Sequence, residues 1–220
     1  MEYKRVTLFA GHYGSGKTNI AVNYAFRLKR DGKPVVIADL DIVNPYFRTK
    51  DSERELTEAG IKLISSEFAS SNVDLPALPQ EIYSVVHTRS DYAVLDIGGD
   101  DRGAYALGRY ADSIVKENNY EMLMVINMYR PLTRDVESTL EVMSEIELAS
   151  GMRFTAVVNN SNIGEETTAQ DVLDSLEYAN CVASAAGLEL KMTTVKEDLY
   201  NQLCESVENL MPLKLQEKIS

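Results

Sequence analysis

The 220-residue sequence lacks the features that mark secreted and membrane proteins. It holds only two cysteines, Cys181 and Cys204, which provide neither a disulfide framework nor a pair at metal-ligand spacing. No apolar run approaches the ~20 residues that a membrane-spanning helix needs. The first five residues include an acid and lead into a brief apolar run, which is unlike a secretory signal peptide. These absences indicate a cytoplasmic protein with no membrane partner.

Basic residues are also scarce. The 22 Lys and Arg residues stand against 34 Asp and Glu residues, which gives a formal net charge of −12. Such a chain would repel a nucleic acid at long range unless a basic patch overrode the balance. The densest basic cluster, residues 27–33, is expected at the end of a helix, where the helix dipole favours cations. We therefore expect no nucleic-acid partner.

Short apolar runs recur along the chain at intervals. Each is rich in Val, Ile, Leu or aromatic residues, is too short for a helix, and does not alternate with polar residues. Strands that are buried on both faces, as in a parallel sheet covered by helices, have this pattern. The predicted strands are Val6–Ala10, Pro34–Ala38, Tyr92–Ile97, Met122–Ile126 and Phe154–Val158, with weaker runs at Ile61–Ile64 and Leu188–Thr193.

Segments with helical periodicity lie between these runs. One helix is predicted from Val136 with a cap at Thr133, and another between a cap at Thr168 and a stop at Gly187. Alternating strands and helices predict βαβ units. The fold class is therefore α/β, a three-layer sandwich with a mostly parallel sheet, in one domain over residues 1–220.

The segment from Gly11 to Thr18 is a full match to the phosphate-binding motif G-x-x-x-x-G-K-[ST]. It directly follows a predicted strand and directly precedes an amphipathic segment, which is the strand–turn–helix context that the motif requires. Glycines let the backbone approach phosphates closely, and backbone N–H groups of the loop and first helical turn converge on them. The predicted nucleotide contacts here are Gly11, Tyr13, Gly14, Ser15, Gly16, Lys17, Thr18 and Asn19.

Two side chains of this loop have chemical roles of their own. Lys17 supplies a positive charge to the β- and γ-phosphates, and the Thr18 hydroxyl is a ligand for Mg²⁺. His12 either contacts the nucleotide or a partner, or is a satisfied loop side chain.

Three carboxylates follow predicted strands and complete the motif. Asp39 and Asp41 lie two residues apart after the second strand, so they point the same way, and either could orient Mg²⁺ or the attacking water. Asp96 ends a later strand and precedes Gly98 and Gly99, the pattern of a Walker B acid that meets Mg²⁺. Gly99 is predicted to approach the γ-phosphate through its N–H group.

These motifs together resemble the ParA/MinD and CobQ/CobB group of P-loop proteins, in the same class as the signal-recognition and nickel-insertion GTPases. The resemblance covers roughly residues 4–160. It implies that Asp41 positions the hydrolytic water and that Asp39 supports the Mg²⁺ shell with Asp96. It also implies that Asn159, after a later strand, reads the adenine. On this basis the predicted catalytic residues are Lys17, Asp41 and Asp39, and the predicted metal ligands are Thr18, Asp39 and Asp96.

The sequence departs from the family pattern at two places. ParA/MinD ATPases have a second lysine early in the loop, where this chain has His12. The GTP-reading pattern Asn-Lys-x-Asp is absent, because residues 159–162 read Asn-Asn-Ser-Asn, and ATP is therefore favoured over GTP. Because neither that lysine nor an arginine finger is evident, turnover is expected to be slow. Arg48 is either a solvated loop residue or a charge near the γ-phosphate.

The leading functional hypothesis is a Mg²⁺-dependent ATPase that acts as a nucleotide switch on an unidentified protein partner. A ligase of the CobQ/CobB or dethiobiotin synthetase type, which would transfer phosphate to a small carboxylate, is the main alternative. A metal-insertion type of GTPase and a scaffold that never hydrolyses its nucleotide also stay open, as does a homodimer. The irregular stretch Ser65–Pro79 either contacts a partner or merely connects elements.

Overall fold

The computed structural model describes residues 3–40, 49–65, 82, 85, 89–99 and 101–215. Asp41, Arg48 and all of the predicted contact stretch beyond Ser65 lie outside these residues.

The described strands form one eight-stranded parallel sheet in the order β3-β2-β4-β1-β5-β6-β7-β8. Each of the seven predicted apolar runs overlaps one of these strands, so the prediction of an α/β fold with a parallel sheet is confirmed. The strands are β1 Val6–Ala10, β2 Val35–Leu40, β3 Lys62–Ser65, β4 Tyr92–Ile97, β5 Tyr120–Ile126, β6 Ala156–Asn159, β7 Glu189–Lys196 and β8 Leu210–Leu213.

Helices connect most of these strands. The α-helices are α1 Lys17–Arg30, α2 Glu53–Glu58, α4 Asp101–Glu117, α5 Val136–Ser150, α6 Ala169–Ala186 and α7 Tyr200–Leu203. Short 3₁₀ helices are η1 Thr49–Ser52, η2 Pro131–Thr133, η3 Gly164–Glu166 and η4 Glu197–Leu199. None of the helices in the described ranges combines the length and the apolar character needed to cross a bilayer.

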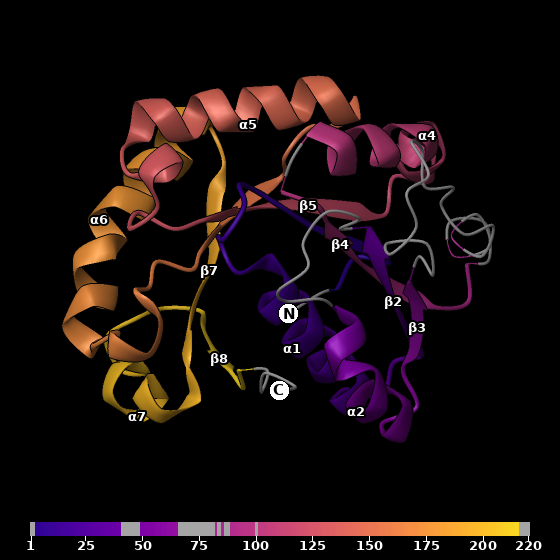
Figure 1. Ribbon diagram of the computed structural model, residues 1–220, viewed down its shortest axis with the longest axis horizontal. Coiled ribbons are helices and arrows are strands. Elements are labelled where there is room, and N and C mark those ends of the chain that lie inside the picture. Colours follow the sequence, from indigo (N-terminus) through magenta and orange to yellow (C-terminus); the bar gives the residue numbers. More distant parts are fainter. Residues whose placement is uncertain are drawn as a thin grey trace.

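The sheet is covered by helices on both faces (Figure 1). On one face, Ile20 of α1 and Leu56 of α2 pack against strand residues such as Ile37. On the other face, α4, α5 and α6 contribute Leu107, Met143 and Val182 to a second cluster. The result is the predicted three-layer arrangement.

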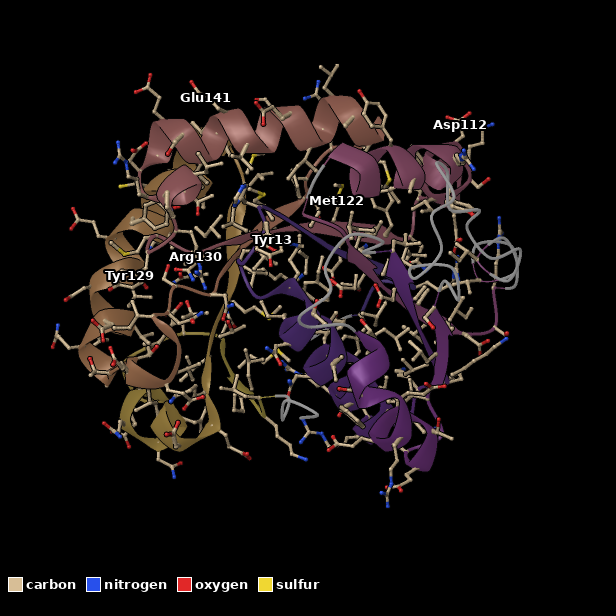
Figure 2. The ribbon with its side chains drawn as sticks, in the orientation of Figure 1. Tyr13, Asp112, Met122, Tyr129, Arg130 and Glu141 are labelled. Carbon is tan, nitrogen blue, oxygen red and sulfur yellow. The ribbon has the colours of Figure 1, made fainter. Side chains whose placement is uncertain are left out.

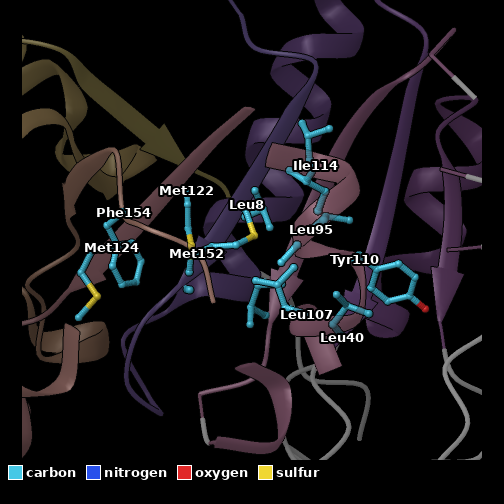
Figure 3. Packing of buried hydrophobic residues seen from close by; sticks show 14 of the residues in the cluster. Leu8, Leu40, Leu95, Leu107, Tyr110, Ile114, Met122, Met124, Met152 and Phe154 are labelled. Carbon is cyan, nitrogen blue, oxygen red and sulfur yellow. The ribbon is translucent and has the colours of Figure 1, made fainter. Parts of the chain in front are cut away.

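Successive side chains of the central strand β1 pack alternately into these two helix-covered clusters. Leu8 belongs to the cluster under α4, and Phe9 belongs to the cluster under α1. Figure 3 shows the first of these layers, where Leu8 and Leu95 of the strands lie near Leu107 and Ile114 of α4. Because side chains alternate along a strand, a strand covered on both faces is apolar at nearly every position. This explains the unbroken apolar runs in the sequence.

Local signals placed most helix ends correctly. The side chains of Thr168 and Asp171 form a reciprocal capping box at the start of α6, and Gly187 ends it in the left-handed conformation. The predicted cap of α5 is wrong. Asp135 caps that helix by accepting a hydrogen bond from the Ser138 N–H, whereas Thr133 lies in η2.

The last strand, β8, was not predicted as a strand. Two of its side chains, Met211 and Leu213, are buried. Among the described strands, β8 pairs with β7 alone and forms an edge of the sheet, a position where proline is tolerated.

Candidate functional site

The loop between β1 and α1 has a backbone that only glycine fits at its two ends. Gly11 has a φ of +149° and Gly16 a φ of +90°, values that L-residues with side chains rarely adopt. A Cβ on Gly11 would lie 2.4 Å from the carbonyl oxygen of Val125, so the loop begins in direct contact with β5. The motif glycines are therefore required by the path of the chain.

The other end of the loop is held by a side chain from the far part of the sequence. Asn160, which follows β6, donates from Nδ2 to the carbonyl oxygen of Ser15 at 2.6 Å. Its Oδ1 accepts a hydrogen bond from Thr194 Oγ1 of β7, also at 2.6 Å. A Cβ on Gly16 would lie 2.1 Å from Asn160 Nδ2. Asn160 thus links the loop to β7, a function that sequence analysis did not find.

Lys17 opens α1 and folds back over the loop. Its side chain is buried, and Nζ donates a hydrogen bond to the carbonyl oxygen of His12 at 3.1 Å. Gly99, after β4, packs against the same loop. A Cβ on Gly99 would lie 2.6 Å from the Tyr13 nitrogen and 3.0 Å from Lys17 Nζ. The structure therefore brings Gly99, Tyr13 and Lys17 together, as the sequence predicted for one site.

Two predicted carboxylates lie side by side at the end of the sheet. Asp39 of β2 and Asp96 of β4 are register partners, and both are buried. Strand alternation places them on the same face as Ile37 and Val94, which is the face that α1 covers. Thr49 of η1 donates a hydrogen bond to Asp96 Oδ2 at 3.2 Å. Asp41 lies outside the described residues.

The donor set fits a magnesium ion. Register partners on neighbouring strands are about 5 Å apart. Mg²⁺ prefers carboxylate, hydroxyl and phosphate oxygens. Thr18, the second residue of α1, supplies a buried hydroxyl on the same face of the sheet.

His12 is partly buried and lies among charges of both signs. Its Nδ1 is 2.9 Å from the carbonyl oxygen of Tyr13. Burial lowers the pKa of His12 below its ordinary value of 6.5, and the charges of Lys17 and Arg130 act in the same direction. The hydrogen bond to Tyr13 and the charge of Glu145 oppose this shift.

Asn159, predicted to read the adenine, is fully buried at the end of β6. Its Nδ2 donates to Ser175 Oγ of α6 at 2.9 Å, and its Oδ1 accepts from the Ser161 N–H at 3.1 Å. Both ends of the amide are thus engaged within the protein. Adenine reading by Asn159 stays a prediction.

A strand, a glycine loop that holds a lysine ammonium, and a helix define a P-loop nucleotide-binding protein. The comparison with family models agrees. The chain belongs to the CobQ/CobB/MinD/ParA nucleotide binding domain family (CbiA), whose model matches residues 6–187. A search of curated proteins finds no match.

Solved structures share the fold. FtsY from Mycoplasma mycoides matches with a TM-score of 0.59 at 15% identity, covering 89% of this chain and 61% of that chain. FtsY from Thermotoga maritima matches with a TM-score of 0.58 at 18% identity, covering 87% of this chain and 62% of that chain. The 54 kDa signal recognition particle protein from Aeropyrum pernix K1, in complex with GDP, matches with a TM-score of 0.53 at 15% identity, covering 87% of this chain and 41% of that chain. This chain therefore spans under two thirds of their length, and at such identities the likeness shows the fold alone.

Proposed function

We propose that the chain is a slow, Mg²⁺-dependent ATPase that works as a nucleotide switch. The observation that carries this proposal is one cluster at the carboxyl end of the sheet. There, the Lys17 ammonium lies inside a glycine loop, and the buried carboxylates Asp39 and Asp96 lie on the face that α1 covers. Membership of the nucleotide-binding family supports the same reading.

The roles of the residues follow from their chemistry. Lys17 and the loop N–H groups would bind the β- and γ-phosphates, and Thr18, Asp39 and Asp96 would hold Mg²⁺. The metal ion would supply positive charge against the charge that develops on the phosphate oxygens. Asp41 would orient the attacking water, as the family resemblance implies. Catalysis would then rest on positioning and electrostatics.

A hydrogen bond suggests how the nucleotide state could be transmitted. Thr49 donates a hydrogen bond to Asp96 Oδ2, a carboxylate oxygen that a metal ion would also bind. Nucleotide loading with Mg²⁺ would compete with this bond, and η1 and α2 would respond because Thr49 begins η1. Such a local exchange is a known route to a switch.

ATP is the proposed nucleotide. The loop after β6 carries no acid at the position where Asn-Lys-x-Asp proteins read guanine. Asn162 stands there, with its Nδ2 bonded to the Asn160 carbonyl and its Oδ1 to the Gly164 N–H.

The test is nucleotide binding and turnover by the purified chain with Mg²⁺. Lys17→Ala should lower ATP affinity at least ~100-fold, about 2.7 kcal/mol, because the phosphates lose their ammonium partner. Asp41→Asn should bind ATP normally and lose hydrolysis. The matched control is Lys116→Ala on the exposed end of α4, which should match the wild type.

Three results would contradict the proposal. Unchanged turnover in Asp41→Asn would remove the role of that residue. Release of ADP only when a small carboxylic acid is present would identify a ligase instead. Preferential binding of GTP in direct competition with ATP would overturn the proposed nucleotide.

A further inference from the structure

The loop after β5 lies beside the phosphate loop and is anchored from within. Asn127, fully buried at its start, accepts hydrogen bonds at Oδ1 from the N–H groups of Tyr129 and Asn162, at 3.0 and 3.2 Å. Its Nδ2 donates to the Asn162 carbonyl at 3.0 Å. Its own carbonyl accepts from Thr133 Oγ1 at 2.7 Å. One asparagine therefore ties the loop after β5 to the loop after β6.

The backbone of Arg130 is held on both sides by this arrangement. Its N–H donates to the Asn127 carbonyl at 3.1 Å, and its carbonyl accepts from the Thr133 N–H at 3.0 Å. Tyr178 of α6 donates to the Thr133 carbonyl at 2.6 Å. Pro131 follows directly and begins η2 with a restricted φ. The loop thus presents the Arg130 side chain from a defined position.

That side chain lies against the phosphate loop. Nε and Cζ of Arg130 are 3.4 and 3.5 Å from the point where a Cβ of Gly14 would stand. The charge of Arg130 also contributes to the lowered pKa of His12. Figure 2 shows Arg130 close to Tyr13 of the loop. Since β1 lies between β4 and β5, Arg130 approaches the loop from the β5 side, whereas Gly99 approaches from the β4 side.

Arg130 differs from its neighbours in its charge balance. Arg134, four residues later, pairs with Asp135, and Arg153 pairs with Glu147. Within the described part of the chain, no carboxylate forms an ion pair with Arg130, although acids outnumber bases in the sequence by 34 to 22. An exposed guanidinium at the rim of a phosphate loop is suited to bind phosphate oxygens in a bidentate manner.

We infer that Arg130 is a built-in arginine that contacts the phosphates of the nucleotide bound to its own chain and stabilises their charge during hydrolysis. This inference rests on the proposed function. In that reaction, the water oxygen forms a bond to the γ-phosphorus while the bond from the γ-phosphorus to the β–γ bridging oxygen breaks. ADP leaves with that oxygen, and the water proton passes to the released phosphate or to solvent.

The inference changes the reason for slow turnover, which the sequence alone attributed to the lack of an evident arginine finger. A P-loop nucleotidase that carries its arginine in cis turns over on the order of 0.01 per second, well below one that receives an arginine from a partner. Arg130 would therefore give the chain activity of its own, independent of a second subunit.

The experiment compares Arg130→Ala and Arg130→Lys with Arg134→Ala, an exposed arginine four residues further along the chain. Arg130→Ala should lower kcat at least ~30-fold and raise KM for ATP less than ~5-fold, because the charge it stabilises is greatest in the transition state. Arg130→Lys should recover only part of kcat, since lysine lacks the planar fork. All three proteins should keep the thermal midpoint of the wild type within a few degrees.

Two controls separate the outcomes. Wild-type turnover per chain should not change with protein concentration, and a mixture of Arg130→Ala with Lys17→Ala should not regain activity. Recovery in the mixture would show that the arginine acts across subunits and would contradict the inference. Equal kcat in Arg130→Ala and Arg134→Ala, with an active wild type, would overturn the inference about Arg130 but leave the proposed function intact. A wild type that binds no ATP would instead overturn the proposed function.

Discussion

Arg5 and Arg130 lie at opposite ends of the same sheet and have opposite surroundings. Arg5 precedes β1 at the amino end, is buried, and forms an ion pair with Glu117. Its guanidinium also donates to the carbonyl oxygens of Val85 and Asp91. Arg130 follows β5 at the carboxyl end, is exposed, and lies over the phosphate loop. The guanidinium at the amino end is satisfied within the fold, whereas the guanidinium of Arg130 at the carboxyl end is exposed.

A second buried acid repeats the pattern of the amino end. Glu121 of β5 accepts hydrogen bonds from Thr7 Oγ1 and the Tyr24 hydroxyl, and it pairs with Lys191 of β7 at 3.1 Å. Burial and this carboxylate raise the pKa of Tyr24. Charges that are paired within the fold contribute to stability and leave nothing for a ligand. The comparison indicates that a ligand can bind where the fold leaves a cation without an ion-pair partner among the described residues, as it does for Arg130 beside the phosphate loop.

The largest expected effect concerns stability at the amino end. Arg5→Ala should lower the free energy of unfolding by about 3–5 kcal/mol, because it leaves Glu117 buried without its partner. Urea denaturation measures the change. The control is Arg54→Ala, an exposed arginine paired with Glu58 on α2, which should unfold at nearly the same urea concentration as the wild type because solvent screens this ion pair. A loss below 1 kcal/mol in Arg5→Ala would break the comparison between the two ends.

The next effect concerns nucleotide binding at the carboxyl end. Gly99→Ala should lower ATP affinity about 10- to 100-fold, or about 1.4–2.7 kcal/mol, because its Cβ would overlap the Tyr13 backbone. Calorimetry with Mg²⁺ and ATP measures it. Gly108→Ala on α4 is the matched control, since its nearest atom is at 3.5 Å. Unaltered affinity in Gly99→Ala would mean that this contact does not shape the site.

A smaller effect is expected at the link between β7 and the loop. Thr194→Val should destabilise the fold by about 1–2 kcal/mol, because it leaves Asn160 Oδ1 without its buried donor. ATP affinity should fall with it, since Asn160 holds the Ser15 carbonyl. Denaturation and calorimetry on the same variant test both parts. A stability loss with no change in affinity would separate Asn160 from the phosphate loop.

The smallest effect is a pH dependence. The folded pKa of His12 lies below 6.5, so the folded chain binds a proton less readily than the unfolded chain. The stability that the neutral imidazole contributes is present above about pH 6.5 and is lost as the pH falls through the folded pKa. On going from pH 7.5 to 5.5, the thermal midpoint should fall more in the wild type than in His12→Gln. Parallel changes in the two proteins would argue against a lowered pKa.

The sequence predicted the features that depend on nearby residues. The phosphate loop, the seven apolar strands and the capping box at Thr168 each depend on residues that are close together in the sequence. The misplaced cap of α5 was also a local choice, but Thr133 and Asp135 are both good caps and only the path of η2 decides between them. Propensity alone could not rank them.

Asn160 and Arg130 could not be predicted for a different reason. Asn160 contacts Ser15 across 145 residues of sequence, and Arg130 reaches Gly14 only because β5 lies beside β1. Strand order is a property of the whole fold, so no window of the sequence contains it. Proximity of Asp39 to Asp96 was predictable only because both ended strands of an expected parallel sheet.

Calorimetric titration of the full chain with ATP and Mg²⁺ tests the central claim most directly. The account predicts saturable binding of one ATP per chain, which is lost in Lys17→Ala and kept in Lys116→Ala. No measurable heat of binding for ATP at any practical concentration, in a wild-type protein shown to be folded, would contradict it.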